Sequence, residues 1–186
     1  MEKFIRYSLA AIGFACCMTF VSAITQAKIV KLKNDNALYS ADVVSIKTRE
    51  KQLDCLAMNI YREAGSEPFE GKVAVAQVTM NRVNHPQFPK DICGVIYQKN
   101  VIMDKVVCQF SWFCDSAVKT RPVNKVAYNE SYEVAKKVLL ENFRLDILKD
   151  ALYYHAEYVN PRWGLPKIGK IGAHVFYKGK DTNERI

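Results

Sequence analysis

The sequence predicts an α+β fold that is mostly helical and carries a small antiparallel sheet or hairpin. Two segments, residues 49–64 and 123–141, repeat apolar residues at the three- and four-residue spacing of helices with one buried face. Residues 101–113 are instead rich in β-branched and aromatic side chains, which favour an extended conformation. The sequence shows no internal repeat, so these elements are expected to form one domain.

The first 27 residues have the pattern of an export signal, in which basic residues precede an uncharged run at 7–24. Small residues at the end of the run favour cleavage after Ala27, with Ala23 as the alternative site. The run is also long enough for an uncleaved anchor. We therefore expect an exported protein of the periplasm or the extracellular envelope, whose membrane contact is transient and limited to this segment.

The composition after the export segment remains basic. Its formal charge falls from +8 to +7, because the segment holds two basic residues and one acidic residue. An exported basic protein meets anionic wall polymers or lipids more readily than nucleic acid, although solubility alone explains the charge equally well. Residues 28–49 mix charges with scattered apolar side chains and are expected to form a flexible lead-in to a domain at 50–186.

The first two helices are expected to meet at a corner. Gly65 is expected to end the helix of residues 49–64 through a left-handed cap. Ser66 then caps the second helix, and Pro68 lies in its first turn, where a missing N–H costs nothing. The apolar face of this second helix is predicted to contain Val73, Ala76, Met80 and Val83.

The remaining elements follow in order along the chain. They are a proline-punctuated loop at 84–89, a short helix at 91–98, a hairpin or irregular sheet at 101–113, a long helix at 123–141, and short strands at 151–155 and 171–177.

Four cysteines follow the export segment, namely Cys55, Cys93, Cys108 and Cys114. In an oxidising compartment they predict two disulfides, and the sequence leaves all three pairings open. A Cys108–Cys114 bridge would staple a short aromatic loop, and Cys55–Cys93 would then join two helices. A zinc site is disfavoured because the spacing contains no CxxC pair.

Glu63 is the strongest candidate for a catalytic group. It follows Leu56 by seven residues and Ile60 by three, which places it on the inward face of the first helix. Burial and the nearby helix C-terminus should both raise the pKa of this carboxyl, so that it holds a proton near neutral pH as a general acid must. The alternative is a structural ion pair with Arg62 or Arg82.

The other acids have simpler interpretations. Glu67 is placed to stabilise a helix N-terminus, and Glu70 is expected to be solvated. Asp115 is the best candidate for the second carboxylate that most glycosidases use, but its position after Cys114 equally suits a turn.

Residues 109–112, Gln-Phe-Ser-Trp, offer an amide, a hydroxyl and two rings, the groups that bind sugars through ring faces and hydrogen bonds. Alternatively, the two rings are core side chains on one face of a strand, with the amide and the hydroxyl on the other face. Tyr153, Tyr154, His155 and Trp163 are placed to line the same groove.

The three histidines, His85, His155 and His174, show no HExxH-like spacing, so we expect neither a metal nor another cofactor. His155 and His174 are expected to form hydrogen bonds at strand ends. A Cys–His peptidase that uses Cys55 is an alternative, weakened by the expected disulfide of that cysteine.

Five blocks occur in order along the chain: AMNIYREAGSEPFEGKVAVAQVTMNRV, FPKDICGVIYQ, CQFSWFCD, ALYYHAEYVNPRW and GAHVFYK. Together they resemble the SleB/CwlJ-type cell wall hydrolases, the family of spore-cortex-lytic enzyme catalytic domains. The similarity runs from about Leu53 to Lys178. It implies a lysozyme-like fold and a cell wall hydrolase catalytic domain at 50–186.

The resemblance further implies a lytic transglycosylase that cleaves the bond between N-acetylmuramic acid and N-acetylglucosamine in peptidoglycan glycan strands. Glu63 would be its single general acid/base, since the C6 hydroxyl of muramic acid supplies the nucleophile. An N-acetylmuramoyl-L-alanine amidase and a non-catalytic wall-binding protein stay open as alternatives. The residues implied along the glycan groove are Gln109, Phe110, Ser111, Tyr154 and His174.

Overall fold

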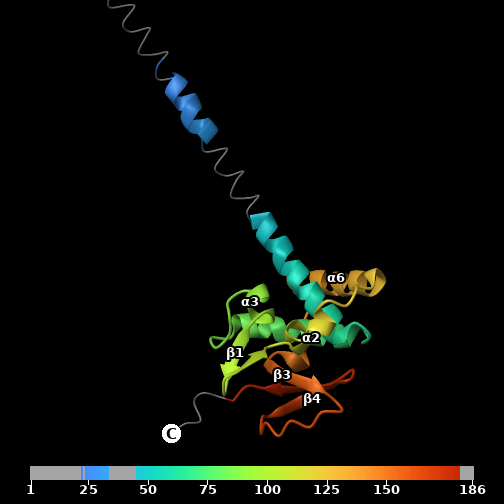
Figure 1. Cartoon of the computed structure of the whole chain (residues 1–186). Coiled ribbons are helices and arrows are strands. Elements are labelled where there is room, and N and C mark those ends of the chain that lie inside the picture. The colour runs from blue at the N-terminus through green and yellow to red at the C-terminus, as the bar shows by residue number, and fades with distance from the viewer. Residues whose placement is uncertain (1–21, 23, 34–44, 181–186) are drawn as a thin grey trace, which may run out of the picture. The chain divides into compact units, whose positions relative to one another are not determined.

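The computed structural model describes residues 22, 24–33 and 45–180, and the chain divides into two compact units, Met1–Thr48 and Arg49–Ile186 (Figure 1). In the described ranges, no helix combines the length and the apolarity that a membrane span requires. Most of the predicted export signal lies outside the described residues, so the signal and its cleavage stay predictions.

The expected flexible lead-in differs from the structure in its described parts. Residues 28–33 and 45–49 are helical. Neither stretch contains glycine or proline, so no strong helix breaker opposes a helix there. Residues 34–44 lie outside the described residues.

The predicted corner between the first two helices exists, but its caps differ from the prediction. Helix runs to residue 64, and α2 spans Phe69–Asn84. Among the described glycines, only Gly164 and Gly172 have positive φ, so Gly65 is not a left-handed cap. Glycine is needed at position 65 because a Cβ there would lie 2.5 Å from the carbonyl oxygen of Tyr61.

Pro68, not Ser66, is the N-cap of α2, and no side chain caps this helix. The difference arises because the N–H of Glu67 donates to the Ala64 carbonyl at 3.0 Å, which makes a tight turn between the helices. Ser66 is therefore an exposed turn residue.

The segment expected to be extended is only partly so. α3 spans Ile92–Ile96, and its N-cap Asp91 accepts from Gly94 N. Strands β1 (Lys99–Ile102) and β2 (Lys105–Cys108) form an antiparallel hairpin. Short helices follow at α4 (Ser111–Cys114) and α5 (Ser116–Lys119).

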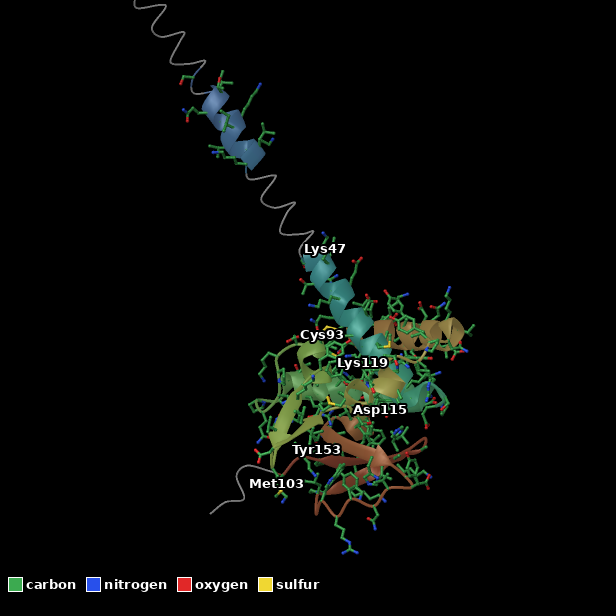
Figure 2. All side chains as sticks on the ribbon, in the orientation of Figure 1. Lys47, Cys93, Met103, Asp115, Lys119 and Tyr153 are labelled. Atoms are coloured by element: carbon green, nitrogen blue, oxygen red, sulfur yellow. A yellow bond between two sulfur atoms is a disulfide. The ribbon has the colours of Figure 1, made fainter. Side chains whose placement is uncertain are left out.

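The strand prediction for residues 109–113 is therefore wrong. The Cys108–Cys114 disulfide, with 5.8 Å between the Cα atoms, closes a loop too short for a strand, and its second half forms the helical turn α4. The expected alternation of side chains between two strand faces fails for the same reason. The second disulfide joins Cys55 in the first helix to Cys93 in α3, so the structure selects one of the three pairings (Figure 2).

The C-terminal part contains the predicted long helix and a three-stranded antiparallel sheet. α6 spans Lys125–Leu140, and the 3₁₀ helix η1 spans Asp146–Leu148. The strands are β3 (Ala151–Ala156), β4 (Lys167–Ile171) and β5 (His174–Lys178), in the spatial order β3-β5-β4. The strand expected at 171–177 is instead the end of β4, a turn at Gly172 with φ +58°, and most of β5.

Helix α2 lies at the centre of this unit, between α6 and the sheet (Figure 1). On one side Val73 and Ala76 join the core of the first helix, α3 and α6. On the other side Ala74 and Val78 pack with Phe176 of β5. The fold is thus mostly helical with small antiparallel sheets, as the sequence predicts.

Candidate active site

A cleft of about 580 Å³ opens where the end of the first helix, α2, the segment from Cys108 to Val118, β3 and the β3–β4 loop meet. The six residues that the resemblance implies for a lytic transglycosylase all line this one cleft. These residues are Glu63, Gln109, Phe110, Ser111, Tyr154 and His174.

Glu63 lies in the last turn of the first helix and is half-buried at the wall of the cleft. Burial raises the pKa of its carboxyl above the usual value, while the Tyr154 hydrogen bond and the charge of Arg82 oppose part of this rise. The Tyr154 hydroxyl donates to Glu63 Oε2 at 3.0 Å. The direction of the pKa shift is the one expected from the sequence.

The alternative ion pair of Glu63 is not formed. Within the described part of the chain, neither Arg62 nor Arg82 places a nitrogen within 4.0 Å of a Glu63 oxygen. Arg62 instead donates from Nη2 to the carbonyls of Lys119 and Arg121. Glu63 is therefore held by a neutral hydroxyl, which leaves its proton available for exchange.

Arg82, which the sequence suggested only as an ion-pair partner of Glu63, is a buried cation that borders the cleft. It is 4% exposed, and its Nε donates to the Leu152 carbonyl at 2.8 Å. Its guanidinium lies 5.2 Å from the ring centre of Phe110. Arg82 follows Val75 by seven residues and Val78 by four, so the helical spacing that identified Glu63 also placed this cation inward.

Gln109 connects this cation to the opposite wall of the cleft. With its amide oxygen turned toward the guanidinium, Gln109 accepts from both Nη1 and Nη2 of Arg82 at 3.2 Å. Burial lowers the pKa of Arg82, while Tyr154, Tyr153 and Glu63 raise it. The guanidinium thus supplies a fixed positive charge beside Glu63.

The two rings of residues 109–112 are core side chains, as one of the two interpretations predicts, and their part in sugar binding stays a prediction. Phe110 and Trp112 are 3% and 6% exposed and belong to the core, yet both also border the cleft. Trp112 Nε1 donates to Asn59 Oδ1 at 2.9 Å, which fixes the indole. Ser111 is exposed at the cleft.

Asp115 also lines the cleft, between α4 and α5 (Figure 2). Its Oδ1 accepts from the N–H groups of Ala117 and Val118 at 2.9 and 3.1 Å, so it is the N-cap of α5. The sequence allowed either a second catalytic carboxylate or a turn residue at this position, and the contacts in the structure are those of a residue that caps a local turn.

An aromatic wall closes the cleft on the side of the sheet. Trp163 lies in the β3–β4 loop and is 42% exposed. The distances from its ring centre to the ring centres of Tyr153, His155 and Tyr177 are 6.3, 5.5 and 5.9 Å. His155 forms hydrogen bonds with the Ala156 carbonyl and the Tyr177 hydroxyl, as expected for this histidine at a strand end. Flat exposed rings of this kind suit the apolar faces of sugars.

His174 differs from its expected role. It is 7% exposed, packs edge-on against Tyr154 at 5.2 Å, and its Nδ1 has no hydrogen-bond partner among the described residues. Glu67 Oε1 faces this nitrogen at 3.9 Å. Burial lowers the pKa of His174, and the charge of Glu67 raises it in part.

Glu67 lies directly before the N-cap of α2, next to the helix N-terminus, and it also makes a contact that the sequence did not predict. Because Pro68 is the N-cap, Glu67 precedes α2, and its side chain turns to the β4–β5 turn. There Oε2 accepts from Ala173 N at 3.1 Å.

No group of three or more metal-ligating side chains comes together within the described ranges. The arrangement provides a half-buried carboxyl with a raised pKa, a hydroxyl that orients it, a fixed cation and an open groove with aromatic and polar walls. These groups suit proton transfer to and from an extended polar substrate.

The comparisons with known proteins identify the family to which this chain is similar. A family model described as Cell Wall Hydrolase matches residues 66–177, a segment that begins three residues after Glu63. The spore cortex-lytic enzyme of Bacillus subtilis is 33% identical over 65% of this chain and 35% of its own length. That of Bacillus cereus is 31% identical over 69% of this chain and 45% of its own length.

One solved structure matches the fold. The catalytic domain of the Bacillus cereus SleB protein aligns over 69% of this chain and 91% of its own, with a TM-score of 0.51 and 29% identity. This likeness agrees with the lysozyme-like α+β fold that the resemblance implied. The chain spans between about a third and a half of the length of the curated relatives described above. The family match covers more than half of the sequence, and this chain belongs to the Cell Wall Hydrolase family.

Proposed function

We propose that this protein degrades peptidoglycan as a lytic transglycosylase, with Glu63 as the single general acid/base. The observation that carries the proposal is the position of Glu63 in the cleft, with a raised pKa and a hydrogen bond from Tyr154. The names of the relatives, spore cortex-lytic enzymes, support a wall glycan as the substrate class.

The reaction needs one proton donor that becomes a proton acceptor. Protonated Glu63 gives its proton to the glycosidic oxygen as the bond from C1 of muramic acid to this oxygen breaks. The carboxylate then takes the proton of the C6 hydroxyl as O6 bonds to C1. An anhydro-muramic end and a free N-acetylglucosamine hydroxyl result, no water is consumed, and Glu63 is again protonated.

The neighbours of Glu63 suit both halves of this cycle. Tyr154 occupies Oε2 and leaves Oε1 for the substrate. Arg82 stabilises the carboxylate after its proton has left, since opposite charge favours the ionised form. Asp115 Oδ1 is engaged as a helix cap, which disfavours this residue as a second catalytic carboxylate.

The walls of the cleft would hold the glycan. Trp163 and Tyr153 present ring faces, and Ser111 presents a hydroxyl. Gln109, Phe110, Tyr154 and His174 complete the proposed groove. The proposed substrate and the predicted export signal both support action in the cell envelope.

The test is mass spectrometry of soluble products released from purified peptidoglycan by the wild-type protein, by Glu63→Gln and by Glu70→Gln. Glu70 is an exposed acid on α2 outside the cleft, so its variant is the matched control. We expect anhydro-muramic ends with the wild type and the control, and none with Glu63→Gln.

Each other result contradicts the proposal in its own way. Reducing ends would mean hydrolysis by water and would direct attention to Asp115. Intact glycans with free amino groups from cut peptides would mean an amidase. Intact glycans and peptides, with the protein bound to the wall, would mean a binding protein.

A further inference from the structure

Glu67 lies in a space that two glycines keep open for it. Its side chain is 13% exposed, although the residue lies between two helices at the surface of the corner. A Cβ at Gly71 would come within 2.9 Å of Glu67 Cβ, and a Cβ at Gly172 would collide with Glu67 Oε2. A residue larger than glycine at position 71 of α2 or at position 172 of the β4–β5 turn would therefore occupy space that the Glu67 side chain fills.

The two oxygens of Glu67 face two different groups on one strand end. Oε2 accepts from the backbone N–H of Ala173, and Oε1 faces Nδ1 of His174 at 3.9 Å. Nδ1 is buried and has no hydrogen-bond partner among the described residues. A carboxylate at this place favours the tautomer with a proton on Nδ1, which leaves Nε2 as an acceptor.

His174 connects this carboxylate to the acid/base. Its ring lies edge-on to Tyr154, with 5.2 Å between the ring centres and 88° between the planes. Tyr154 in turn donates to Glu63 Oε2. The titratable groups that face His174 are Glu67 from the loop before α2, and Tyr154 and His155 from β3.

We infer that Glu67 is a positioning residue that sets the orientation of His174, and through it the seat of Tyr154 against Glu63. The inference rests on the proposed function, because it assigns Glu67 a part in the work of that cleft. Glu67 does not line the cleft, so its proposed role is exerted through His174 and not by contact with substrate. A purely structural role for Glu67, as an anchor of the β4–β5 turn, is the alternative that the experiment must separate.

The experiment compares the full chain with Glu67→Gln and Glu70→Gln. Glutamine keeps an oxygen that can accept from Ala173 N, so the turn stays anchored, but it removes the charge that faces His174. Glu70→Gln removes the same charge from an exposed position three residues away. Two readouts are taken: kcat and KM on purified peptidoglycan, and the titration of His174 by NMR of histidine-labelled protein.

We expect Glu67→Gln to lower the pKa of His174, because a nearby carboxylate favours the imidazolium. We also expect kcat to fall roughly tenfold, as when carboxylate partners of functional histidines are removed in metal sites, with a much smaller change in KM. Glu70→Gln should leave both readouts at wild-type values.

Unchanged titration and unchanged kcat in Glu67→Gln would overturn the inference, and so would equal losses in both variants. If Glu67→Gln folds poorly, Glu67→Asp is used instead, because it keeps the charge but moves it one methylene further from His174. The same two readouts, the kinetic constants and the His174 titration, are then measured on this variant. If the wild type cuts no glycan, the proposed function fails by itself. The His174 titration then still supports the positioning role if it shifts and overturns it if it does not.

Discussion

At the scale of the residue, the burial that suits Glu63 for its proposed catalytic role also has a cost to stability. Its pKa is raised in the folded protein, mainly by burial. Between its unfolded and folded pKa values the folded state holds more protons than the unfolded state, so this group's contribution to stability falls as pH rises through that window.

Glu63→Gln is therefore expected to raise the melting temperature at neutral pH. The neutral amide avoids the cost of burying a charged carboxylate and can still accept a hydrogen bond from Tyr154. Each kcal/mol of stability gained raises the melting temperature by about 4 °C for a domain of this size. The gain over wild type should shrink below the ordinary glutamate pKa. Calorimetry at several pH values measures it, and a neutral-pH melting temperature below that of the wild type would contradict it.

A second prediction concerns the hydroxyl that holds Glu63. Tyr154→Phe removes the hydrogen bond that lowers the pKa of Glu63, so that pKa should rise further. Because the proposed reaction requires protonated Glu63, the alkaline limb of the kcat/KM profile should move to higher pH. The profile of glycan cutting against pH measures the shift, and Tyr158→Phe, which changes a 92% exposed ring at the cleft, is the control. A limb that moves to lower pH would show that Tyr154 acts in another way.

At the scale of the element, we expect one disulfide to contribute mainly to stability and the other mainly to activity. The chain-entropy estimate is about 4 kcal/mol for the long Cys55–Cys93 loop and about 2 kcal/mol for the short Cys108–Cys114 loop. The short loop, however, carries Gln109 to Trp112 of the cleft wall.

We expect serine at both Cys55 and Cys93 to cost more stability in urea unfolding. Serine at both Cys108 and Cys114 should cost more activity on peptidoglycan per unit of stability lost. The reverse order in either measurement would contradict this division. The cystine content of each variant should be verified first by mass spectrometry.

The two glycines with positive φ provide a matched pair on the two loops of the sheet. Gly164 has φ +61° and open space where a Cβ would lie, whereas Gly172 has φ +58° and Glu67 in that space. Gly164→Ala should cost about 1 to 2 kcal/mol from backbone strain alone. Gly172→Ala should cost clearly more in urea unfolding, and equal costs would show that Glu67 moves aside freely.

The elements that follow from apolar spacing were predicted well, and those set by covalent or turn geometry were not. The helices that carry Glu63 and α6 follow from periodicity, because each buries one face. α4 could not be predicted, because Ser111–Cys114 has strand-like composition and becomes helical only within the closed disulfide loop. The split of residues 171–177 depends on the single turn at Gly172.

In the candidate site, too, the positions that follow from helical spacing are predicted and the contacts that depend on turn geometry are not. The inward position of Glu63 follows from helical spacing, and so does that of Arg82, for which the sequence suggests only an ion pair. The role of Glu67 depends on Gly71, Gly172 and the β4–β5 turn, which are far from it in sequence or carry no side chain. The sequence pattern does not predict such contacts, because neither residue of a contact is unusual by itself.

At the scale of the whole molecule, the excess of basic residues should act on wall binding. The formal charge is +8, and peptidoglycan carries peptide carboxylates. Binding to purified peptidoglycan should therefore weaken as NaCl rises toward 1 M, where the Debye length is about 3 Å. Cosedimentation measures binding, and binding that is insensitive to salt would show that the groove alone supplies the affinity.

The contacts that complete the cleft join residues far apart along the chain. The Tyr154 hydroxyl donates to Glu63 across 91 positions, Arg82 donates to the Leu152 carbonyl across 70, and the Ala173 N–H donates to Glu67 across 106. During synthesis the proposed acid/base Glu63, the nearby cation Arg82 and the segment from Gln109 to Trp112 are all made before the strands β3 and β5 that contact them. A ribosome-bound or prematurely terminated chain that ends before β3 thus carries Glu63 without its orienting hydroxyl. The ability to cut a wall would then arise only in the finished chain.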